Sequence, residues 1–154
     1  MDFTIEIITD PGEAAELAGI EQKCFSRPLE PDQITSLLKQ NTNCWFAARG
    51  NENGKIAGSL WMQTVLDEGY IGNVAVHPDY RRQGIADALL DEVDRHAIQK
   101  QLAFVTLEVR AGNVPAVALY KKHGYEKVGR RPHYYTDPAE DALLMTKEYE
   151  KKAL

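Results

Sequence analysis

The sequence predicts an α+β fold: a mixed, mostly antiparallel sheet flanked by helices on both faces. Apolar runs that suit strands recur along the chain and are separated by turn residues. Several of these runs follow one another through short turns, which favours antiparallel pairing, but one long periodic helix at about 82–100 separates two of them. A strand–helix–strand unit after an antiparallel meander implies a mixed sheet covered on both faces. No repeat, low-complexity segment or linker divides the chain, so we expect residues 1–154 to form a single domain.

The first third of the chain predicts one strand and two short helices. Residues 3–9 alternate apolar and polar side chains, as a half-buried strand does. Residues 10–13 (Asp-Pro-Gly-Glu) are typical of a helix start, because an N-cap is followed by proline and then by an acid three residues after the cap. A second start at 31–32 (Pro-Asp) opens a short amphipathic helix that ends near Asn41.

An antiparallel meander follows these helices. Residues 44–49 and 55–65 are apolar runs joined by the turn 50–54 (Gly-Asn-Glu-Asn-Gly), which is typical of a hairpin. Residues 70–76 continue the meander, but Gly72 lies inside this run. A glycine there predicts a bulge or the close approach of another group.

The C-terminal half predicts a central strand, a helix and a final hairpin. Residues 102–110 carry apolar side chains on both faces at their start, which is typical of a covered strand. Asn113 begins the last helix as its N-cap, and Gly124 ends it. Residues 125–130 and 142–147 predict two strands around a polar loop.

The composition limits the classes of function. Apolar residues make up 44% of the chain and charged residues 27%, as in ordinary globular proteins. A net charge of −5 argues against general nucleic-acid binding, which usually needs a basic face. No apolar run approaches the roughly 20 residues that span a bilayer. No basic segment precedes an apolar core at the N-terminus, so we expect a cytoplasmic protein without a signal peptide.

The residues that most often bind metals show no metal-site pattern. Cys24 and Cys44 lack the spacing of metal ligands or of a disulfide framework and fit free thiols of a reducing compartment. The four histidines also lack such spacing. We therefore expect no metal site.

Residues 72–86 carry the strongest functional signal. The apolar run 74–76 ends at a Pro-Asp turn, after which the long helix begins. The first N–H groups of a helix have no intrahelical partner, and the helix dipole favours negative charge there. Gly84 keeps the backbone approachable, while Arg81 and Arg82 supply positive charge and forked donors. This stretch predicts a site for a pyrophosphate group.

Three further residues are candidates for chemistry or binding. Glu108, near the end of the central strand, is either a partly buried acid suited to act as a general base or the ion-pair partner of Arg110 on the same face. Tyr120, one turn before the end of the last helix, is either a core aromatic residue or a proton donor to a leaving group. Asn113 caps the last helix, and its amide could also bind a ligand.

These motifs resemble those of the GNAT superfamily of N-acetyltransferases. Residues 81–86 match its Gln/Arg-x-x-Gly-x-Gly/Ala signature, which follows a bulged strand and opens the long helix in that fold. Residues 107–110 (Leu-Glu-Val-Arg), 134–135 (Tyr-Tyr) and 140–142 (Glu-Asp-Ala) follow in the order found in the family. Within the superfamily, the chain is similar to the bacterial branch that acetylates the N-terminal amine of ribosomal protein S18.

The resemblance implies an enzyme that transfers acetyl from acetyl-CoA to a primary amine, most simply the N-terminal α-amine of a protein. Glu108 would be the general base, and Tyr120 would be the general acid that protonates the departing thiolate of CoA. Asn113 would contact the pantetheine arm, which would also bind the backbone of Val74, Ala75 and Val76. The pyrophosphate would be held by backbone amides of Arg81, Arg82, Gln83, Gly84, Ile85 and Ala86.

Two loops depart from the family's pattern, and both are expected near the acceptor channel. Residues 28–29 read Pro-Leu where the family usually has Pro-Trp, and residues 136–138 (Thr-Asp-Pro) separate the tyrosine pair from its proline. The sequence therefore leaves the identity of the acceptor amine open.

Other functions remain compatible with parts of this pattern. A small-molecule amine or lysine acetyltransferase would use the same donor site. A non-catalytic acyl-CoA-binding module would not need Glu108 and Tyr120 together. ATP binding is disfavoured because no Lys-Ser/Thr follows the glycine. Monomer and homodimer are both compatible with the sequence.

Overall fold

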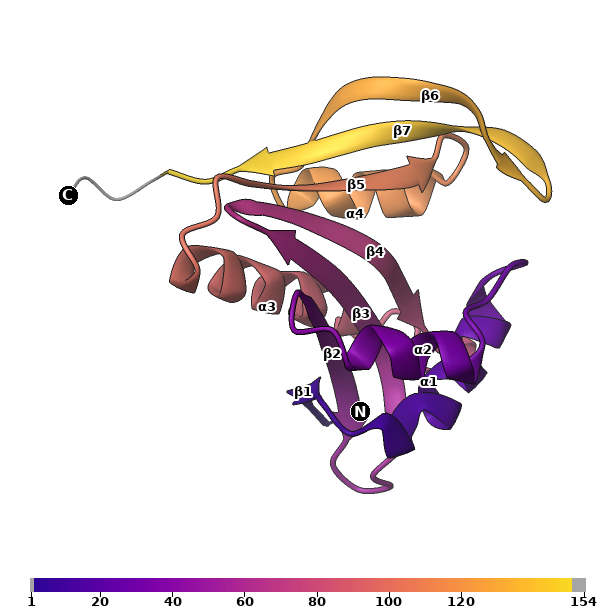
Figure 1. The fold of residues 1–154 in the computed structure, drawn as a ribbon. Coiled ribbons are helices and arrows are strands. Elements are labelled where there is room, and N and C mark those ends of the chain that lie inside the picture. The colour runs from indigo at the N-terminus through magenta and orange to yellow at the C-terminus, as the bar shows by residue number, and fades with distance from the viewer. Residues whose placement is uncertain (1, 151–154) are drawn as a thin grey trace.

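The structure, a computed structural model, describes residues 2–150. Within them a seven-stranded sheet with the order β1-β2-β3-β4-β5-β7-β6 is flanked by helices (Figure 1). The strands are β1 (Phe3–Ile8), β2 (Asn43–Gly50), β3 (Ile56–Val65), β4 (Glu68–Val76), β5 (Phe104–Arg110), β6 (Glu126–Thr136) and β7 (Ala139–Glu148). The helices are α1 (Ala14–Cys24), α2 (Pro31–Leu38), α3 (Ile85–Gln99) and α4 (Val114–Lys122), with short 3₁₀ turns η1 (Pro11–Glu13) and η2 (Pro78–Tyr80).

The sheet is antiparallel at every junction except the one between β4 and β5. These two strands run parallel and pair at only three positions, after which they diverge (Figure 1). The result is an opening in the middle of the sheet, and the predicted mixed sheet is confirmed. The paired residues are Glu68 with Phe104, Gly69 with Val105, and Tyr70 with Thr106.

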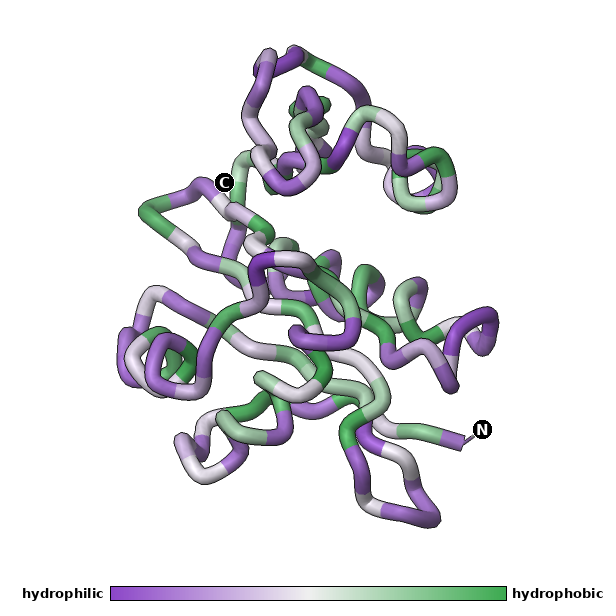
Figure 2. The backbone as a smooth tube through the Cα atoms, turned by 90° about the vertical axis from the view of Figure 1, so that its right-hand side faces the viewer, coloured by the Kyte–Doolittle hydropathy of each residue, from purple (hydrophilic) through white to green (hydrophobic). Residues whose placement is uncertain are grey.

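Helices cover both faces of the sheet, as the sequence predicts. One core cluster includes Leu89 and Val93 of α3 together with Leu107 of β5. A second cluster includes Leu17 of α1 and Ile34 of α2. Hydrophobic residues run along the central strands, whereas the outer loops are mostly hydrophilic (Figure 2). Burial of these two apolar faces is the main stabilising term for such a layered fold.

The bulge predicted at Gly72 is present in β4. Trp61 of β3 pairs with Asn73, and the next residue of β3, Met62, pairs with Ile71, so Gly72 is the extra residue. A Cβ atom at Gly72 would lie 2.2 Å from carbon atoms of the Trp61 ring. The position therefore requires glycine, because the indole ring occupies the space of any side chain.

Most boundaries agree with the predicted ones to within two residues, and two regions differ by more. The long helix begins at Ile85 rather than at residue 82, because Arg82 (φ 64°) and Gly84 (φ 80°) have left-handed backbone conformations that a helix cannot include. The polar loop predicted between the last two strands is instead mostly strand, since β6 and β7 extend to Thr136 and Ala139. The hairpin is irregular between Arg131 and Tyr135, where the register shifts.

In the described part of the chain, no helix is both long enough and apolar enough to cross a membrane. Cys24 and Cys44 are free thiols, as expected from their spacing.

Candidate active site

A cavity of about 530 Å³ lies where β4 and β5 separate. Both strands line it, together with α4, the loop after α1 and the β6–β7 hairpin. The divergence of two neighbouring strands thus creates a concave site in the centre of the sheet. Its walls include residues 24–27, 71–74, 107–110 and 134–137, as well as Asn113, Ala116 and Tyr120.

Glu108 projects into this cavity from β5. The strand buries Val105, Leu107 and Val109 on one face, so period-two alternation places Glu108 on the other. The Glu108 side chain is only 9% exposed. The Tyr70 hydroxyl donates a hydrogen bond to Oε2 of Glu108, and Nε of Arg131 lies 3.4 Å from Oε1. The carboxylate is therefore fixed by two side chains from other strands.

The alternative of an ion pair between Glu108 and Arg110 is wrong. Nη1 of Arg110 lies 3.3 Å from Oε1 of Glu140 and donates to the carbonyl oxygen of Pro138 at 2.8 Å. The guanidinium carbon also lies 4.3 Å from the ring centroid of Tyr135. Arg110 binds the hairpin instead, because a carboxylate, a carbonyl oxygen and an aromatic face of the hairpin all lie within reach of its guanidinium group.

Tyr120 of α4 lines the same cavity, although only 8% of the residue is exposed. Its ring packs edge-on against Tyr125, with the ring centroids 6.0 Å apart. Burial raises the pKa of Tyr120 to about 12, and the Tyr135 phenol contributes in the same direction. The phenol is therefore protonated at neutral pH and able to donate a proton. Tyr120 is a core aromatic residue that also faces the cavity, so its role as a proton donor stays a prediction.

The end of β4 is predicted to bind the pantetheine arm through its backbone. Of the three residues predicted to bind the pantetheine arm, Val74 lines the cavity and Ala75 is buried. The Val76 carbonyl accepts from Nε of Arg81 at 3.3 Å and from Sγ of Cys24 at 3.4 Å. Arg81 thus ties the predicted pyrophosphate loop to the strand that precedes it.

The loop before α3 presents a helix start that no side chain caps. Arg81, Arg82, Gln83 and Gly84 are all exposed in this loop. The side chain of Ile85 is buried in the core at 1% exposure, so only its backbone amide is available to a ligand. Ala86, the last residue of the predicted set, is half-buried in the first turn. Uncapped amides at the positive end of a 15-residue helix suit an anionic group.

Asn113 has both of its predicted positions. Its Oδ1 accepts a hydrogen bond from the Ala116 amide at 3.3 Å, so it caps α4. The residue also lines the cavity at the edge of α4. The amide nitrogen is the group left for a ligand in this geometry.

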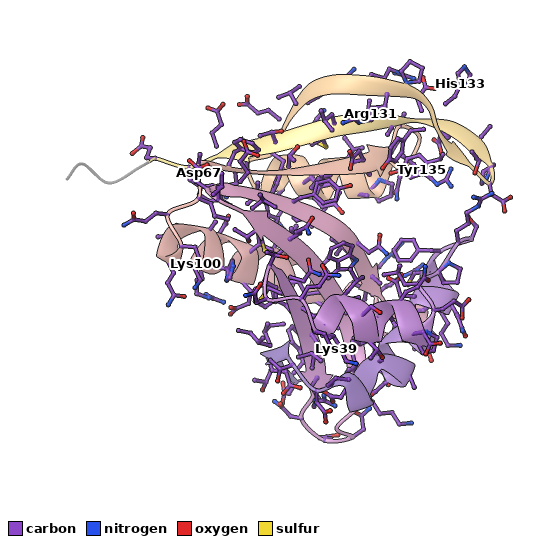
Figure 3. All side chains as sticks on the ribbon, viewed as in Figure 1. Lys39, Asp67, Lys100, Arg131, His133 and Tyr135 are labelled. Carbon is purple, nitrogen blue, oxygen red and sulfur yellow. The ribbon has the colours of Figure 1, made fainter. Side chains whose placement is uncertain are left out.

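The two loops that depart from the family's pattern meet over the cavity. The Ser26 hydroxyl donates to the Asp137 carbonyl oxygen at 2.6 Å, which joins the loop after α1 to the β6–β7 hairpin. Tyr134 and Tyr135 line the same cavity as Ser26 and Asp137. Figure 3 shows Tyr135 and Arg131 on the hairpin, alongside β5.

Sequence reasoning missed the two partners of Glu108. Tyr70 lies at the last position of β4 that pairs with β5, and Arg131 lies where the register of the hairpin shifts. Predicting the contact of Tyr70 with Glu108 would have required the pairing of Tyr70 with Thr106. This pairing places Tyr70 beside the face of β5 that carries Glu108. No local pattern around residue 70 gives that register.

One cluster away from the cavity contains a histidine that the sequence did not associate with acids. Ligand-type atoms of Asp91, Asp94 and His123 lie within 4.8 Å of one another. Nζ of Lys147 already lies 2.8 Å from Oδ1 of Asp94, and Nε2 of His123 lies 2.8 Å from Oδ1 of Asp87. These contacts, the Lys147–Asp94 ion pair and the hydrogen bond between His123 and Asp87, join α3 to β7 and to the end of α4.

Comparison with known proteins then identifies the family. The model of the acetyltransferase (GNAT) family matches residues 14–125 of this chain. The chain belongs to the GNAT family of acetyltransferases. A relative from Bacillus subtilis (strain 168) is 35% identical over 126 residues, which make up 82% of this chain and 83% of the relative.

The Bacillus subtilis relative is named a putative [ribosomal protein bS18]-alanine N-acetyltransferase, and a relative and a solved structure from Escherichia coli carry the same enzyme name. The [ribosomal protein bS18]-alanine N-acetyltransferase of Escherichia coli (strain K12) is 44% identical over 96 residues, or 61% of this chain. The match spans 65% of that relative, just under two thirds of its length. The crystal structure of the ribosomal-protein-S18-alanine N-acetyltransferase from Escherichia coli aligns with a TM-score of 0.86 at 32% identity and covers 97% of each chain. The predicted GNAT fold is confirmed.

Proposed function

We propose that this GNAT protein is an acetyl-CoA-dependent N-acetyltransferase whose acceptor is the N-terminal α-amine of a protein such as ribosomal protein S18. The observation that carries the proposal is the placement of Glu108 and Tyr120 in one cavity between the separated strands. A base and an acid in one site suit a reaction that removes a proton from one reactant and returns one to a leaving group. The names of the similar proteins support the choice of acceptor.

The residues around the cavity fit acetyl-CoA, which supplies an activated acetyl group when bound. The uncapped start of α3 and the exposed loop before it are suited to the pyrophosphate. Val74 and Asn113, on opposite sides of the opening, are placed to contact the pantetheine arm. Backbone N–H groups along the end of β4 would polarise the thioester carbonyl, as in an oxyanion hole.

Glu108 acts on the acceptor. An α-amino group has a pKa of about 8, so a large fraction is protonated at neutral pH and must lose a proton before it can attack. The Glu108 carboxylate accepts this proton, either directly or through a water molecule. The neutral amine then attacks the thioester carbonyl, its nitrogen releases a second proton to solvent, and the new amide bond is complete when the carbon–sulfur bond breaks.

Tyr120 acts on the leaving group. As the carbon–sulfur bond breaks, the phenol donates its proton to the CoA thiolate. Burial raises the pKa of Tyr120 further above neutral, so the phenol carries this proton at neutral pH. The phenolate is then reprotonated from solvent before the next turnover.

The two bridged loops favour an extended chain end as acceptor. The Ser26–Asp137 contact and the tyrosine pair line the side of the cavity next to Glu108. A backbone that ends in a free amine can enter between these loops and place only its terminal nitrogen at the base. A lysine side chain or a polyamine would use the same donor site but would make fewer contacts with the loops.

The deciding experiment is a thiol-release assay with acetyl-CoA and a panel of acceptors. The panel contains peptides with different free N-termini, including alanine, together with lysine peptides whose N-termini are blocked and polyamines. We expect thiol release with N-terminal peptides, most rapidly with the N-terminal sequence of ribosomal protein S18. Release only with blocked lysine peptides or polyamines would contradict the acceptor, and no release with any amine would favour a non-catalytic acyl-CoA-binding module.

A further inference from the structure

We propose that Tyr70 is a positioning residue that holds Glu108 in its productive orientation across the opening of the sheet. The inference rests on the proposed N-acetyltransferase function and adds to it a residue that the family motifs in this chain do not include. Tyr70 does not belong to the cavity lining in the described part of the chain, whereas Glu108 does. Tyr70 therefore acts on the reactants only through Glu108.

The geometry follows from the place where β4 and β5 separate. Tyr70 pairs with Thr106 at the last parallel position, and Glu108 lies two residues farther along the same face of β5. Beyond this position β4 provides no paired neighbour for Glu108. The long side chain of Tyr70 spans this gap, and its hydroxyl donates to Oε2 of Glu108.

The contact is of the strong, charge-assisted kind. Burial raises the pKa of Tyr70, and the hydrogen bond to Glu108 and the charge of that carboxylate raise it further. The phenol thus stays protonated and acts as a donor. Hydrogen bonds from a neutral hydroxyl to a carboxylate are roughly twice as strong as those between neutral groups.

Tyr70 is the less exposed of the two partners of Glu108. Arg131 approaches the other carboxylate oxygen at 3.4 Å, but its side chain is 55% exposed and stems from the irregular part of the hairpin. A charged pair with that exposure is screened by water. Each carboxylate oxygen has two lone pairs, so these contacts leave one on each oxygen for the acceptor.

Fixing the orientation of a base affects the rate more than it affects binding. A free glutamate side chain samples several rotamers, and displacement of a reacting group by about 1 Å can cost on the order of 100-fold in rate. Removal of the Tyr70 hydroxyl should therefore lower kcat while leaving the acetyl-CoA site intact.

The test is a double-mutant cycle of Tyr70→Phe and Glu108→Gln, followed by thiol release with the best acceptor peptide. We expect Tyr70→Phe to lower kcat about tenfold, which is within the range for a misplaced group, with the KM for acetyl-CoA changed less than twofold. In the Glu108→Gln background the same substitution should have no further effect on kcat. That loss of effect is expected only if Tyr70 acts through Glu108.

Tyr149→Phe is the matched control. Tyr149 is another half-buried tyrosine whose hydroxyl donates to a carboxylate, Oδ1 of Asp94 at 2.5 Å, but this pair lies outside the cavity. The Tyr149→Phe substitution should lower the melting temperature without lowering kcat. The comparison separates loss of a tyrosine–carboxylate contact in general from loss of the one at Glu108.

The outcomes distinguish the inference from the proposed function. If Glu108→Gln strongly lowers kcat but Tyr70→Phe keeps the wild-type kcat, the inference on Tyr70 alone is overturned. Equal fractional losses in the wild-type and Glu108→Gln backgrounds would overturn it as well. If Glu108→Gln is as active as wild type, the base assignment fails and the role of Tyr70 fails with it. A wild-type protein inactive towards every amine overturns both proposals.

Discussion

Tyr120 combines burial with access to the cavity, and this combination makes its proton available without exposing its ring. Tyr120→Phe removes only the hydroxyl and keeps the edge-on packing against Tyr125. We expect kcat to fall by about 10²- to 10⁴-fold, the usual contribution of a general acid, with the KM for acetyl-CoA nearly unchanged. Steady-state kinetics with both substrates measures the two effects, and an unchanged kcat would remove Tyr120 from the mechanism.

Glu21 is a buried carboxyl in α1 that joins three parts of the structure. Its Oε1 accepts from the Asn73 side chain at 2.8 Å and from the Leu29 amide at 3.2 Å. Among residues 2–150, no group hydrogen-bonds to its Oε2. Burial raises the pKa of Glu21, although these hydrogen bonds oppose the shift. Glu21 thus connects the bulge of β4 with the loop after α1.

The raised pKa of Glu21 predicts how stability depends on pH. The folded state binds this proton more tightly than the unfolded state, so the group costs stability as pH rises above its ordinary value of 4.5. The cost is complete once pH exceeds the raised pKa of the folded state. Glu21→Gln removes the charge but keeps the accepting oxygen. The melting temperature of this variant relative to wild type should therefore rise with pH from 4.5 upward, and a difference independent of pH would contradict the prediction.

At the scale of the element, the bulge in β4 gives a prediction on stability. In Gly72→Ala the new methyl group would overlap the Trp61 ring, so the indole or the strand must shift. Such overpacking typically costs about 1–3 kcal/mol of unfolding free energy. Urea denaturation of Gly72→Ala and the wild type measures this loss of unfolding free energy.

Gly19→Ala is the control for this substitution. Gly19 lies within α1, and a Cβ atom there would meet no heavy atom within 4 Å. Alanine is favoured over glycine in a helix by about 1 kcal/mol, so this variant should gain stability. Equal effects of the two substitutions would mean that the close approach of Trp61 to Gly72 has no energetic consequence.

Elements with strong local signals could be predicted from the sequence. Asp10 accepts a hydrogen bond from the Gly12 amide at 2.8 Å, as its N-cap pattern indicates, although the first turn is the 3₁₀ turn η1. Gly72 forms the predicted bulge, and Glu108 lies on the predicted face of β5. Each of these features depends on residues close together in the sequence.

Elements without such signals could not be predicted. The β6 strand is mostly exposed along its length, so it lacks the apolar alternation that marks a half-buried strand, and its sequence predicts a loop over part of it. Its strand character comes from pairing with β7. The contact between Tyr70 and Glu108 joins residues 38 positions apart and depends on the parallel register of β4 and β5. A single sequence contains no direct measure of that register.

At the scale of the whole molecule, ligand binding should be visible as thermal stabilisation. A ligand that binds only the folded state at 100 times its Kd adds about 2.7 kcal/mol to the unfolding free energy. For a chain of 154 residues, that corresponds to a rise in melting temperature of roughly 5–10 °C. We expect acetyl-CoA to produce such a rise and ATP to produce little, so equal shifts would contradict the assignment of the cavity to acetyl-CoA.

The brief pairing of β4 with β5 also affects how the molecule unfolds. Three residue pairs are the only backbone ladder between β1–β4 and β5–β7 in the described chain. Cooperativity between the two halves must therefore come from side chains, chiefly the core cluster that contains Ile71 from one half and Leu107 and Met145 from the other. A ligand that binds both sides of the opening would strengthen this coupling. The molecule should then unfold more nearly as a single unit when its substrate is bound than when it is free.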